Sequence, residues 1–132
     1  MGETILVRSV LTPEKVAGGE AFLRRLDEEG IPIVAAFWLF YEEAVEWRLM
    51  LATPLAEKLD YRILSRKMRA VFESMGETRL GWRDTMIVEP GFRDVKRYGY
   101  QVWKGRLSKT AIYHVEDGHR YFYRFLPLRL RG

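Results

Sequence analysis

The side chains best suited to chemistry in this sequence gather near its C-terminal end. His114 and His119 lie there, close to Arg120 and Arg124. The same segment holds three tyrosines: Tyr113, Tyr121 and Tyr123. Imidazole and phenol groups can move protons, and guanidinium groups can stabilise a charged phosphorane, so this combination suits metal-independent, toxin-like cleavage of RNA. One hypothesis is therefore an endoribonuclease with a catalytic set of His114, His119, Arg120 and Arg124.

A hairpin pattern explains the two histidines without catalysis. The residues on either side of 116–118 alternate as strands do, and Glu-Asp-Gly at these positions is typical of a turn. If the last two of these residues form the loop, Glu116 pairs with His119 and His114 pairs with Tyr121. This register does not bring the imidazoles together. The favoured interpretation is that His114 and His119 are ordinary strand residues on a half-exposed sheet and that the hairpin has no catalytic residue.

We predict no metal and no cofactor. Glu116 and Asp117 lie between the histidines, but their spacing matches no recurrent ligand pattern. The sequence has no cysteine, which excludes a thiol nucleophile and a thiolate zinc site. It also lacks a glycine-rich phosphate-binding loop and a Gly-x-Ser-x-Gly elbow.

A cluster of cations and aromatic rings is the best indication of function. Cations that meet phosphates, interleaved with rings that stack on bases, are what single-stranded nucleic acid binding requires. The predicted contact residues are Arg93, Lys96, Arg97, Tyr98, Tyr100, Trp103, Lys104, Arg106, Lys109, Arg120 and Arg124. The alternative interpretation places the hairpin rings in the core, with solvated arginines behind them.

The charge of the chain is divided unequally. Residues 1–92 carry 12 Lys and Arg against 15 Asp and Glu, whereas residues 93–132 carry 10 against 3. The balance is thus −3 in the first part and +7 in the second. The second part also holds eight of the eighteen aromatic residues. Such asymmetry favours an acidic partner, either nucleic acid or protein.

The composition predicts one globular domain, spanning 1–132. Hydrophobic residues make up 48% of the chain and charged residues 30%, as in ordinary globular proteins. No apolar run is long enough to span a membrane, and the start lacks the pattern of a secretory signal. We expect a cytoplasmic, bacterial-type protein without a membrane partner.

Two Thr-Pro pairs predict where helices begin. The pair at 12–13 starts a helix that ends at Gly30, and glycines at 18–19 within it indicate close packing by another segment. The pair at 53–54 opens a second helical region that stops at Gly76. Its apolar stripe is Leu64, Met68, Val71, Phe72 and Met75. Its opposite face, which could extend the cationic surface, carries Arg62, Arg66 and Arg69.

Apolar runs predict the strands. Residues 33–41 are apolar on both faces, which indicates a central strand covered on each side, and 46–52 returns as its hairpin partner. A third strand is predicted at 82–89, and a final hairpin at 110–115 and 119–125.

Two shorter elements complete the prediction. Phe92, Val95 and Tyr98 predict a third helix that ends before Gly99, and 5–10 could form an N-terminal strand. The order α-β-β-α-β-(α)-β-β predicts an α+β fold with two to three helices on a mixed, mainly antiparallel sheet.

Several segments resemble a group of small uncharacterised bacterial α+β proteins of unknown function. The similarity lies in the apolar run 33–39, the strand Glu-Trp-Arg-Leu at 46–49 and the step Leu-Ala-Thr-Pro at 51–54. It continues in Val-Glu-Asp at 115–117 and Tyr-Phe-Tyr-Arg at 121–124. The group has no assigned activity, so the resemblance implies a fold and not a function.

Three functional hypotheses follow. The leading one is a non-catalytic binding module that engages nucleic acid or an acidic protein through its C-terminal third. The second is the metal-independent ribonuclease. The third is a structural protein that forms a homodimer through its aromatic hairpin, since tyrosine, tryptophan and arginine are common in interfaces.

Overall fold

The computed structural model describes residues 10–41, 43–103, 112–115 and 118–125. Its α-helices are α2 (Pro13–Glu28), α3 (Tyr61–Glu73) and α4 (Arg93–Trp103). Its strands are β1 (Ala35–Tyr41), β2 (Glu46–Ala52), β3 (Thr85–Val88), β4 (Ile112–Val115) and β5 (Gly118–Phe125). Two 3₁₀ turns, η1 (Pro54–Glu57) and η2 (Trp82–Asp84), precede α3 and β3. The predicted α+β class and element order are confirmed; the possible strand at 5–10 falls almost wholly on residues outside this description.

The strands form one mixed sheet in the order β3-β2-β1-β5-β4. The central strand, β1, runs antiparallel to both β2 and β5, and β4 is antiparallel to β5. Among the described strands, only the β2–β3 pair is parallel. The mainly antiparallel arrangement was predicted, and β1 and β2 cover nearly the predicted residues because a continuous apolar run followed by a turn defines them.

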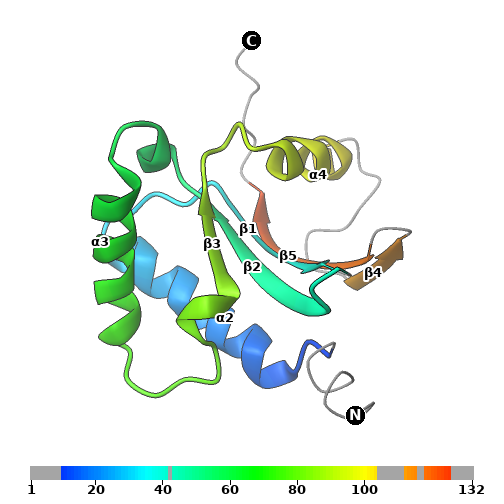
Figure 1. Ribbon diagram of the computed structural model, residues 1–132, viewed down its shortest axis with the longest axis horizontal. Coiled ribbons are helices and arrows are strands. Elements are labelled where there is room, and N and C mark those ends of the chain that lie inside the picture. Colours follow the sequence, from blue (N-terminus) through cyan, green and yellow to red (C-terminus); the bar gives the residue numbers. More distant parts are fainter. Residues whose placement is uncertain (1–9, 42, 104–111, 116–117, 126–132) are drawn as a thin grey trace.

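Helices cover both faces of the sheet (Figure 1). On one face, α2 and α3 pack over a core that includes Trp38, Leu49 and Leu51. On the other face, α4 packs over a second core that includes Phe37 and Met50. Since neighbouring residues of a strand point to opposite faces, β1 contributes to both cores and is buried almost throughout, as predicted.

Both Thr-Pro pairs begin helical structure, but only the first begins a long helix. The Thr12 hydroxyl accepts a hydrogen bond from the Lys15 amide at 3.2 Å and caps α2. Thr53 caps only the short turn η1. The Asp60 carboxylate then caps α3, accepting from the Arg62 amide at 2.8 Å. The predicted second helical region is therefore two elements, because a second capping residue starts a new helix.

Two of the three glycines that were predicted to end helices do so, and the third does not. Gly30 and Gly76 have φ of 76° and 78°, the left-handed conformation that follows a helix, so both predicted stops are confirmed. By contrast, α4 continues through Gly99 to Trp103, and the prediction that it ends before Gly99 is wrong. A glycine that keeps helical dihedrals costs only about 1 kcal/mol and does not end a helix by itself.

Two glycines in α2 allow other segments to pack closely against it, as predicted. A Cβ on Gly18 would lie 2.9 Å from Oγ1 of Thr78. A Cβ on Gly19 would lie 2.5 Å from the hydroxyl oxygen of Tyr123 in β5. The absence of a side chain at Gly19 therefore lets the terminal hairpin dock onto α2.

Candidate functional site

The terminal hairpin pairs its two histidines. The backbone partners are Val115 with Gly118 and His114 with His119. The predicted register, which paired His114 with Tyr121, is wrong because Gly118 already belongs to β5 and not to the loop. Cross-strand partners lie on the same face of a sheet, so positions 114 and 119 are neighbours.

The two arginines of the catalytic hypothesis, Arg120 and Arg124, lie on opposite faces of the sheet, so they do not form one catalytic set with the histidines. Arg120 lies on the α4 side of the sheet, where its guanidinium stacks over the ring of Tyr98. Arg124 lies on the α2 side and forms two hydrogen bonds with the Asp27 carboxylate, at 3.0 and 2.6 Å. It also donates to the carbonyl oxygen of Ile33 at 3.0 Å. The sheet separates the two guanidinium groups.

The described rings of the hairpin belong to the interior or to its margin. Phe122 and Phe125 are buried in the core beneath α4. The Tyr123 hydroxyl accepts a hydrogen bond from the Trp38 indole at 2.9 Å and donates one to the Val16 carbonyl oxygen. Burial raises the pKa of this hydroxyl. Tyr121 is half-buried and packs edge-on against Tyr123.

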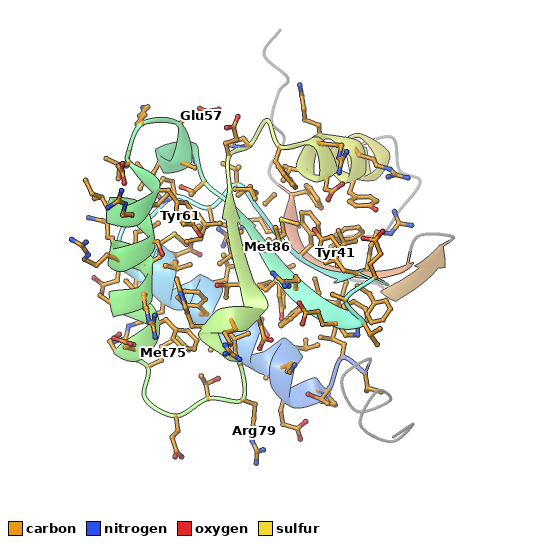
Figure 2. The ribbon with its side chains drawn as sticks, viewed as in Figure 1. Tyr41, Glu57, Tyr61, Met75, Arg79 and Met86 are labelled. Atoms are coloured by element: carbon orange, nitrogen blue, oxygen red, sulfur yellow. The ribbon has the colours of Figure 1, made fainter. Side chains whose placement is uncertain are left out.

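A polar cluster fills the space between the sheet and α4. Figure 2 shows Tyr41 at the sheet end of this space. Burial, followed by the negative charge of Asp94, raises the pKa of Tyr41 to about 12. Tyr98, one of the predicted contact residues, is buried here with 1% exposure, so its ring supports α4 and is not offered to solvent.

Arg120 is the unusual member of this cluster. Its side chain is buried, with 4% of the residue exposed, and its guanidinium carbon lies 4.5 Å from the centroid of the Tyr98 ring. Its Nε is buried and has no hydrogen-bond partner. Among the described residues, no carboxylate lies within ion-pair distance of it. A buried cation adds positive potential beneath α4, which the Asp94 carboxylate of the same cluster offsets in part.

The outer face of α4 carries exposed cations. Arg93, Lys96 and Arg97 are all exposed, and their i, i+3, i+4 spacing places them on one side of the helix. The one acid of the helix, Asp94, is only 13% exposed, whereas the Arg93 side chain is 86% exposed. Although Arg93 Nε lies 3.9 Å from Asp94 Oδ1, the carboxylate is largely buried and the three cations are exposed. The Arg97 guanidinium also lies 5.4 Å from the centroid of the Tyr98 ring.

The arginine row of α3 does not extend the surface of α4. Arg62, Arg66 and Arg69 are exposed, as predicted. However, α3 packs on the opposite face of the sheet from α4, so the expectation of one continuous surface is wrong. Arg69 lies 3.2 Å from the Glu73 carboxylate and stacks 5.9 Å from the centroid of the Trp82 ring.

Sequence reasoning missed the exposed apolar groups beside this row. Tyr61 (Figure 2) and Ile63 are 61% and 54% exposed, respectively, on the first turn of α3, and Lys67 is exposed one turn further on. The apolar stripe of α3 was a signal for Ile63, which lies away from it on a 3.6-residue helix. Tyr61 lies on the same side of the helix as Leu64 and Met68, and it is exposed because it is at the first turn, so the stripe does not predict its exposure.

Several predicted contact residues cannot be placed in this surface. Lys104, Arg106 and Lys109 lie outside the described residues. Tyr100 and Trp103 belong to α4, but the description of that helix does not extend to their side chains. Within the described ranges, no three metal-ligating side chains come together. None of the described helices is long and apolar enough to cross a bilayer.

The contact between Tyr41 and Asp94 predicts a titration. Because the pKa of Tyr41 is raised to about 12, the neutral phenol is favoured in the fold. Its contribution to stability is complete below the ordinary pKa of about 10 and is lost as the pH rises through 12. Asp94→Asn should lower the pKa of Tyr41, as measured by tyrosinate absorbance, with Tyr41→Phe identifying the transition. An unchanged curve in Asp94→Asn would show that the carboxylate does not act on Tyr41.

No protein-family model, no curated protein and no solved structure matches this chain.

Proposed function

We propose that this protein is a non-catalytic binding module for single-stranded nucleic acid and that the outer face of α4 contacts the phosphate backbone. The observation that carries the proposal is the segregation of charge on α4. Three cations face solvent on one side, while the carboxylate of Asp94 is largely buried. A helix surface of this kind attracts phosphates and has no acid of its own facing outward to repel them.

Arg120 supports the same face from beneath. Its charge is buried behind Tyr98 and forms no ion pair with a carboxylate among the described residues, so the Asp94 carboxylate of the same cluster offsets its field only in part. Charges in a low-dielectric interior act over longer distances than charges in water. The potential at the surface of α4 is thus higher than its three exposed cations alone would produce.

Nucleic acid is favoured over an acidic protein by the residue types. Two of the three exposed cations, Arg93 and Arg97, are arginines, whose planar fork binds phosphate through two hydrogen bonds. Phosphates also follow one another at short, regular intervals, which suits a row of cations on one side of a helix. Binding of an acidic polypeptide in place of the oligonucleotide is the alternative outcome of the test below.

The test compares oligonucleotide binding by two triple variants of equal net charge. Arg93→Gln, Lys96→Gln and Arg97→Gln together remove the cations of α4, and glutamine preserves helix propensity. The matched control neutralises three exposed cations elsewhere: Arg24, Lys58 and Arg83. Fluorescence anisotropy at low salt should show affinity reduced about tenfold or more by the α4 variant and less than about threefold by the control.

Equal losses in the two variants would mean that only net charge matters and would overturn the assignment to α4. Binding of polyglutamate, but not of the oligonucleotide, would assign the face to an acidic protein. RNA incubated with the protein and a chelator is expected to remain intact, because Arg120 and Arg124 lie on opposite sides of the sheet from each other. Cleavage that disappears in a His114→Ala, His119→Ala variant would instead establish the ribonuclease.

A further inference from the structure

A second cationic face lies on α3, and the proposed function does not use it. Leu64, Met68 and Val71 bury one side of α3 against the core. The exposed side carries four cations: Arg62, Arg66, Lys67 and Arg69. Glu73 is the one acid within the helix, and it lies beside Arg69. The outer face of α3 therefore has a net positive charge over nearly its whole length.

The dimensions of this face suit a nucleic acid backbone. The 13 residues of α3 span about 20 Å at 1.5 Å per residue. Arg62, Arg66 and Arg69 follow the i, i+4, i+7 spacing and so form a straight row along the helix. A nucleic acid strand advances by a few ångströms per phosphate, so several phosphates face a row of this length.

An exposed ring beside the row distinguishes this face from a general anion-binding surface. Tyr61 (Figure 2) is largely exposed and directly precedes Arg62. Ile63 is exposed on the same turn. These two are among only three large hydrophobic side chains that are exposed in the described part of the chain. A ring that stacks on a base next to arginines that bind phosphate fits single-stranded nucleic acid better than it fits an acidic protein.

The sheet keeps this face apart from α4. The core beneath α3 and α2 lies on one side of the sheet, and the core beneath α4 lies on the other (Figure 1). A short segment of nucleic acid on α4 therefore cannot cover the row on α3 at the same time. Each face is available to a segment of its own.

We propose that α3 is a second binding face for single-stranded nucleic acid and that one protein molecule bridges two strands. The bridging half of this inference rests on the proposed function of α4, whereas the α3 face stands on its own charges and exposed ring. Bridging by a single molecule increases the effective concentration of one strand near the other. The protein would then bring strands together, which a module with one face does not do.

The experiment uses two short, non-complementary oligonucleotides, one with a donor dye and one with an acceptor dye. The wild-type protein should raise energy transfer between them when the strands are in modest excess. The α3 variant combines Arg62→Gln, Arg66→Gln and Lys67→Gln and keeps Arg69, which contacts Glu73 and Trp82. It should lose energy transfer while its affinity for one oligonucleotide stays within about threefold of wild type. The triple variant at Arg24, Lys58 and Arg83 serves as the charge-matched control.

The outcomes separate the two proposals. If the α3 variant bridges as well as wild type, the second face is overturned, and a dimer joined elsewhere explains the energy transfer. If the α4 variant keeps the binding that the α3 variant loses, the proposed function of α4 fails and α3 is the principal face. If the wild-type protein binds no oligonucleotide at low salt, both proposals fail.

Discussion

Replacing Gly19 with alanine is expected to destabilise the protein by about 2 kcal/mol, although glycine-to-alanine changes within helices usually stabilise. The new Cβ would lie 2.5 Å from the hydroxyl oxygen of Tyr123 and 3.1 Å from two of its ring carbons. The ring cannot simply turn aside, because its hydroxyl is held by Trp38 and by the carbonyl of Val16. Either α2 moves away from β5 or both hydrogen bonds are lost.

The expected size follows from opposing effects. Alanine gains about 1 kcal/mol in helix propensity over glycine. Overpacking costs about 1–3 kcal/mol, and leaving buried polar groups such as the Trp38 indole unpaired costs about 1–3 kcal/mol more. The loss therefore exceeds the gain. Urea denaturation of Gly19→Ala measures the balance, and an increase in stability would contradict the packing of Tyr123 against α2.

A double variant tests the contact itself. Tyr123→Phe alone should destabilise the protein, because the Trp38 indole and the Val16 carbonyl both lose a partner. In the Gly19→Ala background, the same change should cost less, because removing the hydroxyl relieves the clash with the new methyl group. Additive effects of the two changes would mean that residues 19 and 123 do not touch.

Replacing Arg120 with methionine is expected to stabilise the protein by about 1–4 kcal/mol. Burial of the guanidinium costs several kcal/mol, and stacking on Tyr98 returns about 2 kcal/mol. The unpaired Nε adds a further cost. Methionine has a similar length, carries no charge and packs well against aromatic rings, so it can fill the same space beneath α4.

The same variant should bind oligonucleotide more weakly than wild type, because the buried charge no longer raises the potential at α4. A gain in stability together with a loss of affinity would show that Arg120 is retained for binding at the expense of the fold. The measurement is denaturant unfolding alongside anisotropy. If Arg120→Met destabilises the protein by more than about 1 kcal/mol, the guanidinium is compensated after all, and its supporting role in the proposal is wrong.

Much of the fold could be predicted because local signals define its elements. The capping threonine at 12 starts α2, and the apolar run of β1 requires helices on both faces of the sheet. The errors in the prediction arose where local signals compete. Asp60 starts a new helix within a region that reads as continuous, and Gly99 keeps a helical conformation that glycine often abandons.

The surface was harder to predict, because exposure is decided by contacts between distant segments. Alternation along β5 gives the spacing of its rings, but only the packing of α2 and α4 decides that Phe122 is enclosed and Tyr123 is bonded. The same packing buries Arg120, although an isolated strand pattern gives no reason to expect it.

Averaging of charge over long segments understated the positive charge of α3, although the arginine row on its exposed side was predicted. The first 92 residues have a balance of −3, which hides the four cations of α3 among acids on other elements. The helical periodicity around Leu64 and Met68 contained the missing information, since residues opposite the apolar stripe must face solvent. The helical periodicity identified the row at 62, 66 and 69 from the sequence, and a charge count for each helix face would have added Lys67.

The salt dependence of oligonucleotide binding tests the central claim most directly. For single strands, each phosphate contact contributes about −0.7 to the slope of the logarithm of affinity against the logarithm of salt concentration. If Arg93, Lys96 and Arg97 contact phosphates, the α4 variant should show a slope shallower by about 2 than wild type, whereas the charge-matched control should keep the wild-type slope. Equal slopes for wild type and the α4 variant would contradict the claim that α4 binds the backbone.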